Sequence, residues 1–446
     1  STTMTNMPAV QEEARMPPDD QVKTWMLVYY ASGDKQPDPN KYWMDVGKNF
    51  YERTKSLIKP NDEVKQMAAT LTADAKTDDE KLARLFEFVR TKIKNISNDA
   101  SGLTAEERAK LKDNKSPGDT LKRGMGTIMD IDCLFAALAI AAGFDARIVL
   151  SPDRGDIFFN KELPNAYFID PRNIAVNVGG KWKFFNPGYN YIPFGMLLWR
   201  EEGQQALITD PKQPVWVDTP MTSHEGSQVQ RRAKLKLSED GTLEGEIRIE
   251  YTGHFAIERK EELDEESETE RETALKDEIK ARISAAEITN VKIENVTDDV
   301  KPLVYSYNLR VPGYAQRTGR RLFLQPAFFQ YGLKPLFSSA TRKHAIYFHY
   351  PWSEDDQVHI DVPAGYTLDN ADAPAPFASG KISEYKPSLA ITSDGKTLVY
   401  KRTFFFGGGG SVLFPVEAYP AVKGYFDQLN KQDSHSIALR QAAASN

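Results

Sequence analysis

The sequence predicts an α+β fold, with helices and an antiparallel sheet in its first half and β-rich domains after them. Three observations favour this class. Residues 43–92 place apolar side chains at helical spacing, residues 172–188 (RNIAVNVGGKWKFFNPG) have the pattern of a β-hairpin, and residues 231–251 alternate like a pair of strands. Helices followed by runs of strands are typical of α+β proteins. At roughly 150 residues per domain, the length also predicts several domains.

The first predicted elements are a strand and three helices. Residues 22–31 alternate as in a strand, and a helix is predicted from about residue 43 to 58. Asn61 is suited to cap a second helix, and residues 77–96 (TDDEKLARLFEFVRTKIKNI) begin a third with a threonine and two acids. Residues 97–121 are polar and are predicted to form a loop.

The apolar stretch 126–149 (GTIMDIDCLFAALAIAAGFDARIV) is predicted to be a helix that begins near residue 128 and leads into a strand. The following hairpin has Gly179-Gly180 as its two-residue turn. Counting outward from this turn places Asn173 opposite Asn186. Because directly opposed residues have Cα atoms within about 5.5 Å, these two side chains are expected to be close enough to touch.

The C-terminal half is predicted to be rich in strands. Residues 231–251 form a strand pair that turns at Asp240-Gly241, and short strands such as AIYFHYP and TLVYKRTFFF follow Pro326. Residues 258–283 are predicted to form one charged helix. Its acids and bases interleave at i,i+3 and i,i+4, which is typical of a solvated face.

Composition excludes several classes of function. A net charge of −6 offers no basic surface for nucleic acid, and a single cysteine permits neither an intramolecular disulfide nor a multi-cysteine zinc site. No metal or other cofactor is expected. The longest apolar run, Cys133 to Ala142, is about half a membrane span, so no transmembrane segment is expected. The polar, proline-rich lead from Ser1 suggests a fragment or a processed chain, which would hide a targeting signal.

Residues 126–149 resemble the transglutaminase-like superfamily of papain-like cysteine enzymes, whose pattern reads roughly G-x-C-x-D-x-A-L-L-x-A-A-L-L-R-A-x-G-I-P-A-R-V-V. Gly126 matches the turn glycine, Asp130 the aspartate, and residues 143–147 (GFDAR) the closing G-I-P-A-R. The closing block fixes the register and puts Ile128 at the nucleophile position. A thiolate there would gain from the unpaired N–H groups at the start of the helix.

Cys133 lies five residues after that nucleophile position. At about 100° per residue, its side chain turns about 140° away from the side chain of residue 128. Its helical neighbours include Leu134, Ala137 and Leu138. Cys133 is therefore expected to be a small buried hydrophobe and not a nucleophile.

The resemblance continues in the hairpin, where the family has a histidine in the first strand and a W-x-x-x-D-P-T-like end to the second. Those two positions fall on Asn173 and Asn186. Isoleucine offers no nucleophile, and an amide does not titrate near neutral pH. The resemblance therefore implies a papain-like transglutaminase core whose triad is substituted at Ile128, Asn173 and Asn186.

The resemblance covers about residues 40–205 and extends, more loosely, to bacterial proteins in which such a domain is flanked by uncharacterised β-rich domains. It implies a periplasmic or cell-envelope location. The predicted organisation is 1–39, a linking strand or the remnant of a preceding β domain; 40–220, the transglutaminase-like core; 221–320, a β-rich domain with one charged helix; and 321–446, a C-terminal β-rich domain.

The favoured function is that of a catalytically inactive module that binds or scaffolds a peptide, protein or glycan. Apolar and amide groups in the cleft suit such contacts, and Phe184 lies on the same hairpin face. The candidate binding residues are Ile128, Asp130, Asn173, Asn177, Trp182 and Asn186. Alternatively, the cleft is filled in and the domain is an architectural spacer.

An enzyme is the second hypothesis: an active cysteine peptidase or transglutaminase-type acyl transferase that uses Cys133, or a hydrolase of another chemistry in the same cleft. Asp130 and Asp132 are two residues apart on a helix and do not face each other, so they are not expected to form an acid/base pair. A third hypothesis places carbohydrate or protein binding on the aromatic segments LFLQPAFFQYG and KRTFFF.

Overall fold

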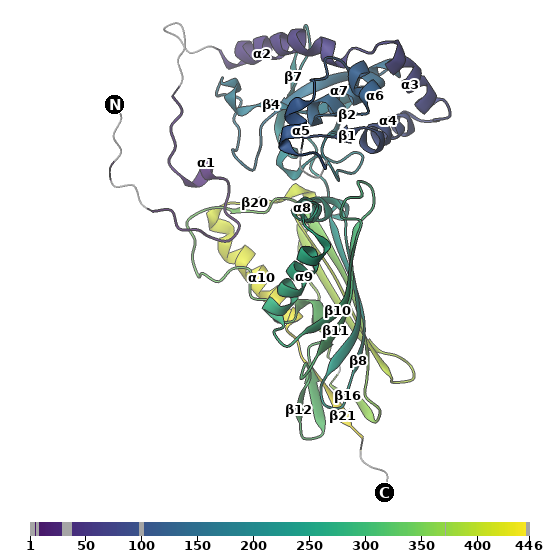
Figure 1. Ribbon diagram of the computed structural model, residues 1–446. Helices are drawn as coiled ribbons and strands as arrows, with labels where there is room; N and C mark the ends of the chain where they lie inside the picture. Colours follow the sequence, from purple (N-terminus) through teal and green to yellow (C-terminus); the bar gives the residue numbers. More distant parts are fainter. Residues whose placement is uncertain (1–4, 6–8, 29–37, 98–101, 371, 443–446) are drawn as a thin grey trace. The chain divides into compact units, whose positions relative to one another are not determined.

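The computed structural model has the predicted α+β architecture, with helices and an antiparallel sheet before residue 222 and mostly strands after it (Figure 1). It describes residues 5, 9–28, 38–97, 102–370 and 372–442. The chain forms two compact units. The first contains residues 1–12 and 16–222, and the second contains residues 13–15 and 223–446.

The first unit, here called the core unit, combines helices with one main sheet. Its helices are α1 (Asp19–Val22), α2 (Pro39–Thr54), α3 (Asp62–Thr72), α4 (Asp78–Lys92), α5 (Ala105–Lys110), α6 (Pro117–Arg123) and α7 (Ile128–Ala141). Its strands are β1 (Lys94–Asn95), β2 (Met125–Gly126), β3 (Asp145–Ser151), β4 (Asp170–Val178), β5 (Lys181–Phe185), β6 (Gln205–Ile208) and β7 (Val215–Asp218).

Helix α7 is the centre of the core unit. It begins at Ile128, as predicted, because Thr127 and Asp130 form a capping box that satisfies the first free N–H groups. Residues 131–139 are all buried, which suits a helix that is apolar on every side. Helices α3, α4 and α6 and strands β3 and β4 pack around it.

The main sheet of the core unit is antiparallel and runs in the order β5-β4-β3-β6-β7. The β4–β5 hairpin has the predicted register, with Val178 opposite Lys181 and Ile174 opposite Phe185. Side chains alternate between its two faces. Ile174, Val176 and Phe185 join the apolar cluster around α7, whereas Ala175 and Phe184 pack with Leu197 and Ile208 in a separate cluster.

Two predictions for the core unit are wrong. A strand was predicted at residues 22–31, but the described residues 22–28 form no strand. Helix α1 ends at Val22, and residues 23–28 have no regular structure and no partner strand. Residues 29–31 lie outside the described residues. The predicted loop 97–121 contains α5 and most of α6. A Thr104–Glu107 capping box begins α5, and Ser116 caps α6.

The second unit, here called the sheet unit, consists mostly of strands. Its helices are α8 (Gly253–Leu263), α9 (Glu268–Arg282) and α10 (Tyr419–Asp433). Its strands are β8 (Gln228–Leu237), β9 (Leu243–Tyr251), β10 (Glu287–Glu294), β11 (Leu303–Val311), β12 (Gln316–Thr318), β13 (Arg321–Leu324), β14 (Ile346–Tyr347), β15 (Trp352–Asp361), β16 (Tyr366–Asn370), β17 (Phe377–Ser379), β18 (Ser383–Ile391), β19 (Thr397–Phe406), β20 (Leu413–Phe414) and β21 (Ile437–Gln441).

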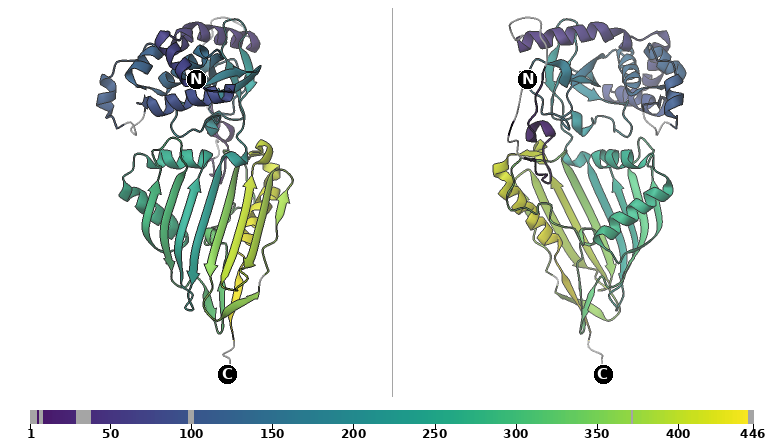
Figure 2. Two further views of the ribbon diagram at one scale, coloured as in Figure 1. Left: turned by 90° about the vertical axis from the view of Figure 1, so that its right-hand side faces the viewer. Right: turned by 60° about the vertical axis from the view of Figure 1, so that its left-hand side comes forward.

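An eight-stranded sheet in the order β10-β11-β9-β8-β15-β19-β18-β17 dominates the sheet unit. Helices α9 and α10 lie against the same face of this sheet (Figure 2). The apolar cluster on the covered face also includes side chains of the small sheet β12-β13-β21-β16. Along β8, β9 and β11 the buried residues alternate with exposed or half-buried ones, as expected when one face of a sheet is solvated.

One prediction for the sheet unit is also wrong, and one predicted domain boundary lies inside this compact unit. The single helix predicted at 258–283 is two helices, α8 and α9, because Ser267 and Glu270 form a capping box that starts a new helix. The predicted boundary between residues 320 and 321 does not separate two compact domains. Strand β15 pairs with β8 on one side and with β19 on the other, so strands from both segments share one sheet. Among the described residues, no helix is both long and apolar enough to span a membrane.

Candidate functional site

Ile128 is the first residue of α7 and is half-buried. Its backbone N–H donates to the hydroxyl oxygen of Ser97 at 2.9 Å. Asp130 accepts from the backbone N–H and the hydroxyl of Thr127, both at 2.9 Å. The predicted ligand residue Asp130 therefore has a structural role, because it completes the capping box with the N-cap residue Thr127.

Cys133 lies in the apolar cluster around α7, with 4% of its surface exposed. Burial, with the nearby Asp132 and Asp130, raises the pKa of its thiol well above the usual range. A thiol in this environment stays protonated at neutral pH and is a poor nucleophile.

Asn173 and Asn186 meet at one carboxylate, that of Glu201. The Asn173 side-chain amide donates to Glu201 Oε2 at 3.2 Å, and the Asn186 amide donates to Oε1 and Oε2 at 3.0 and 2.9 Å. Asn173 has 1% of its surface exposed, whereas Asn186 and Glu201 have none. The structure thus brings together the two residues that were predicted to stand at the family's histidine and aspartate positions, and both are buried.

Burial raises the pKa of Glu201 to about 7, although the hydrogen bonds from Asn173 and Asn186 and the charge of Arg172 act to lower it. Asp132 is a second buried acid nearby. Burial raises its pKa well above the usual range, its hydrogen bond from the Gly188 N–H at 2.8 Å lowers it, and Glu201 raises it further. Both carboxyl groups therefore favour protonation more strongly than exposed carboxyl groups do.

The loop after β5 packs directly against the start of α7. A Cβ atom at Gly188 would lie 2.3 Å from the carbonyl oxygen of Ile128, so only glycine fits there. The Gly188 carbonyl accepts from Asn95 at 2.9 Å, and its N–H is the donor to Asp132. These contacts close the space between the helix start and the segment that carries Asn186.

The remaining candidates, Asn177 and Trp182, lie opposite each other at the turn end of the hairpin. The Asn177 side chain accepts from the backbone N–H of Gly180 at 3.0 Å and so stabilises the turn. Trp182 packs against the cluster that contains Phe184. Asn177 is four residues from Asn173, or about 13 Å along an extended strand, so this pair does not belong to the Glu201 cluster.

Glu201 is the residue that the sequence did not reveal. It lies in WREEG, and two adjacent glutamates before a glycine are typical of an exposed turn. In the structure it ends a short 3₁₀ helix, Trp199–Glu201, and its backbone carbonyl accepts from the Thr219 hydroxyl at 2.7 Å. Only the tertiary packing of this segment buries the side chain against the hairpin.

Two surface pockets open on the core unit. One, of about 580 Å³, lies beside the start of α7 and includes Asp130 among basic residues such as Lys110 and Arg123. The other, of about 780 Å³, combines the exposed rings of Trp25 and Tyr167 with five aspartates. Within the described part of the chain, no three histidine, cysteine, aspartate or glutamate side chains are arranged to hold a metal ion.

One structural comparison concerns most of the chain. The chain is similar to a crystal structure from Parabacteroides distasonis described as that of a "putative protease". The sequence identity is 10%, the TM-score is 0.48, and the match covers 89% of this chain. The chain spans 58% of the length of that structure. A search among curated proteins gives no match.

Two family models match separate parts of the chain. The first, described as the transglutaminase-like superfamily, matches residues 65–185, which include α7 and the β4–β5 hairpin. The second, a domain of unknown function called DUF3858, matches residues 320–439 in the sheet unit. The chain therefore contains a transglutaminase-like superfamily domain at residues 65–185 and a DUF3858 domain at residues 320–439.

Proposed function

We propose that this protein is a catalytically inactive member of the transglutaminase-like group that binds a peptide, protein or glycan. The observation that carries this proposal is that Asn173 and Asn186 are buried and donate to Glu201. The sequence resemblance assigns these two residues to the histidine and aspartate positions and Ile128 to the nucleophile position. None of these side chains can attack a carbonyl carbon or take a proton from a thiol.

The alternative function is that of a cysteine peptidase or acyl transferase with a non-standard site. Such an enzyme would need Cys133 as its nucleophile, because the chain has no other cysteine. Burial and the raised pKa of the Cys133 thiol argue against this role. Glu201 has a pKa near neutrality, as a general base needs, but it has no exposed surface from which to reach a substrate.

The inactivity proposal is tested with the full chain against a panel of peptide, amide and glutamine substrates. We expect no turnover above that of a matched Cys133→Ala variant. Turnover that disappears in Cys133→Ala would establish the alternative enzyme, and turnover that disappears in Glu201→Gln would establish a hydrolase of another chemistry.

The ligand site that we propose is the pocket of about 780 Å³ on the core unit, because Gly188 packs against Ile128 and Asn173 and Asn186 are buried. Trp25 has 48% and Tyr167 78% of its surface exposed, and the Phe168 ring lies between them, 6.0 and 5.3 Å from their centroids. Exposed aromatic rings offer stacking surfaces for sugars and peptide side chains. The aspartates around them, such as Asp156 and Asp170, can accept hydrogen bonds from hydroxyl or ammonium groups.

Glycan and peptide arrays probed with the full chain test this site. We expect any ligand found in this way to bind at least about tenfold more weakly to a Trp25→Ala/Tyr167→Ala variant. The control is Phe323→Ala, which removes a similarly exposed ring from the sheet unit. Equal binding by the wild type and the double variant would rule out this pocket. We also propose a cell-envelope location, which fractionation of the native cells would test.

A further inference from the structure

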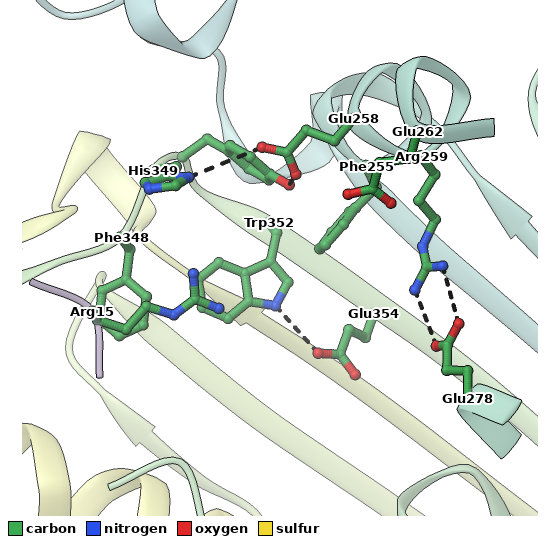
Figure 3. Close-up of a pocket in the computed structure, with 11 residues that line it drawn as sticks. Arg15, Phe255, Glu258, Arg259, Glu262, Glu278, Phe348, His349, Trp352 and Glu354 are labelled. Carbon is green, nitrogen blue, oxygen red and sulfur yellow. Dashed lines mark hydrogen bonds and ion pairs between the residues drawn. The ribbon is translucent and has the colours of Figure 1, made fainter. Parts of the chain in front are cut away.

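A pocket of about 580 Å³ in the sheet unit combines aromatic rings with carboxylates (Figure 3). Its walls come from α8, from Glu278 on α9 and from the segment 348–354. It lies within one compact unit and shares no residue with the triad positions. The inference below therefore does not depend on the proposed function.

The aromatic part of the pocket is a fixed surface. Phe255 meets Tyr350 edge to face at 5.5 Å between ring centroids, and Trp352 lies 5.6 Å from Phe348. The Trp352 indole N–H donates to Glu354 at 3.2 Å, which holds the plane of the ring. Such surfaces attract cations through the negative faces of their rings.

The carboxylates give the pocket an excess of negative charge. Glu258, Glu262, Glu278 and Glu354 line it, together with Arg15, Arg259 and His349. Glu354 also pairs with Arg231 and Arg402, so the excess of negative charge comes from the other three glutamates. Arg259 pairs with Glu278 at 3.2 Å, and Glu258 accepts from the Tyr350 hydroxyl at 2.6 Å. Glu262 follows Glu258 by one helical turn and is exposed, so two carboxylates face the opening from the same side of α8.

The chain already places one cation at this pocket, through the short segment Glu13–Arg15. The Arg15 guanidinium lies 5.6 Å from the centre of the Phe348 ring, and Figure 3 shows Arg15 among the residues that line the pocket. Its charge also lowers the pKa of Glu258, although burial raises that pKa more strongly. Arg15 has a left-handed backbone conformation, with φ of 59°. Residues other than glycine rarely adopt this conformation unless contacts with the rest of the protein stabilise it.

That support is a set of hydrogen bonds to the backbone and side chains of the segment. The Arg15 carbonyl accepts from the backbone N–H of Tyr347 on β14 at 2.8 Å, and the Ala14 carbonyl accepts from the Arg342 guanidinium at 2.9 Å. The Glu13 carboxylate accepts from the backbone N–H groups of Lys343 and His344 at 2.8 and 3.2 Å. Main-chain hydrogen bonds beside a side-chain pocket fix the position of the bound segment, while the pocket selects its side chain.

We propose that this pocket is a recognition site for the guanidinium or ammonium group of a peptide turn with the pattern Glu-x-Arg or Glu-x-Lys, and that Glu13–Arg15 is the chain's own copy of this ligand. The internal segment competes with any external peptide because both use the same contacts. Release of Glu13–Arg15 opens the site to a partner with a basic side chain.

The test measures binding of a fluorescent peptide with the sequence of residues 10–17 (VQEEARMP) to the full chain. A Glu13→Ala/Arg15→Ala variant frees the site and should bind the peptide at least tenfold more tightly than the wild type does. A peptide with citrulline in place of arginine, which has the same shape without the charge, should bind at least tenfold more weakly. Similar affinities for the arginine and citrulline peptides, or no binding to the double variant at millimolar concentrations, would overturn the proposal.

A second measurement uses the wild-type chain without freeing the site. Trypsin needs an extended backbone around the bond that it cleaves, and the hydrogen bonds to the Ala14 and Arg15 carbonyls hold this backbone as a turn, so the rate of cleavage after Arg15 reports release of the segment. Glu262→Gln should raise the rate at least threefold, whereas Glu265→Gln, an exposed glutamate outside the pocket, should leave it unchanged. Equal rates in the two variants would contradict the role of the pocket carboxylates.

Discussion

Asn173 and Asn186 donate their side-chain amides to the same carboxylate, so two residues 13 positions apart share Glu201 as their acceptor. By the sequence resemblance, a histidine and an acid joined by a hydrogen bond would be expected at these positions in a cysteine enzyme. Here the titrating group is Glu201, which approaches the pair from outside the hairpin. The cluster is therefore a buried acid held by two neutral amides, and the ionisation of Glu201 changes the stability of the fold.

The first prediction concerns the pH dependence of this stability. The pKa of Glu201 rises from 4.5 to about 7 on folding, so the unfolded chain releases this proton at lower pH than the folded chain. The contribution of Glu201 is most favourable below pH 4.5 and is lost as the pH rises towards 7, by roughly 3 kcal/mol in total. Glu201→Gln removes this loss and should be more stable than the wild type at pH 8. Urea unfolding of both chains at pH 5 and pH 8 measures the difference.

Glu87→Gln is the matched control for this experiment because Glu87 is an exposed glutamate on α4. Its unfolding free energy should follow that of the wild type at both pH values. If Glu201→Gln kept the wild-type pH dependence, Glu201 would have an ordinary pKa in the folded chain.

The second prediction concerns thiol reactivity. Native wild-type protein should react with iodoacetamide at pH 7.5 at less than about a hundredth of the rate of an exposed thiol, because Cys133 is buried and protonated. Ile128→Cys should take up one equivalent, because residue 128 is half-buried at the start of α7. Mass spectrometry of peptides identifies the labelled residue. Labelling of Cys133 in the folded wild type would contradict its assignment to the core.

Local signals predicted the fold best where they agree with the packing. Helix α7 and the β4–β5 hairpin have strong periodicity and clear end signals, and both occur as expected. The prediction of one helix at 258–283 was wrong because the spacing of the charged residues continues across Ser267 and hides the cap at which a second helix begins. The joining of residues 228–311 and 352–406 in one sheet depends on the pairing of β8 with β15, a long-range contact that periodicity does not encode.

The site was predictable only in part for a similar reason. Counting from the turn correctly placed Asn173 near Asn186, because the register of a short hairpin is set locally. It did not predict which group the two amides would meet, since Glu201 arrives from a segment outside the hairpin. It also did not separate Asn177 and Trp182 from the cluster, although alternation puts them on the same face.

The third prediction separates hydrogen bonding from charge at Asp132. This side chain accepts from the buried N–H of Gly188, and burial raises its pKa. Asp132→Asn keeps an acceptor oxygen without a charge to bury, so it should be as stable as the wild type or more stable at pH 8. Asp132→Ala leaves the Gly188 N–H without its acceptor and should cost about 1–3 kcal/mol. Urea unfolding at pH 8 compares the variants, and equal destabilisation by both would contradict this explanation.

The fourth prediction concerns a buried ion cluster in the sheet unit. Arg402, with 2% of its surface exposed, donates to Asp433 at 2.8 Å and to Glu354 at 2.8 Å. Burial raises the pKa of Glu354, but Arg402 and Arg231 lower it to about 2. Arg402→Met keeps the volume of the side chain but leaves the carboxylates with too little positive charge, and it should cost at least about 3 kcal/mol of stability at pH 7.

Because Glu354 contributes stability above pH 4.5 that is lost as the pH falls towards 2, the difference in stability between Arg402→Met and the wild type should shrink over that interval. Denaturant unfolding of the full chain measures this trend, with the exposed Lys401→Ala as a control that should change little. A loss of stability in Arg402→Met that is constant from pH 7 to pH 3 would show that packing, and not charge, explains the role of Arg402.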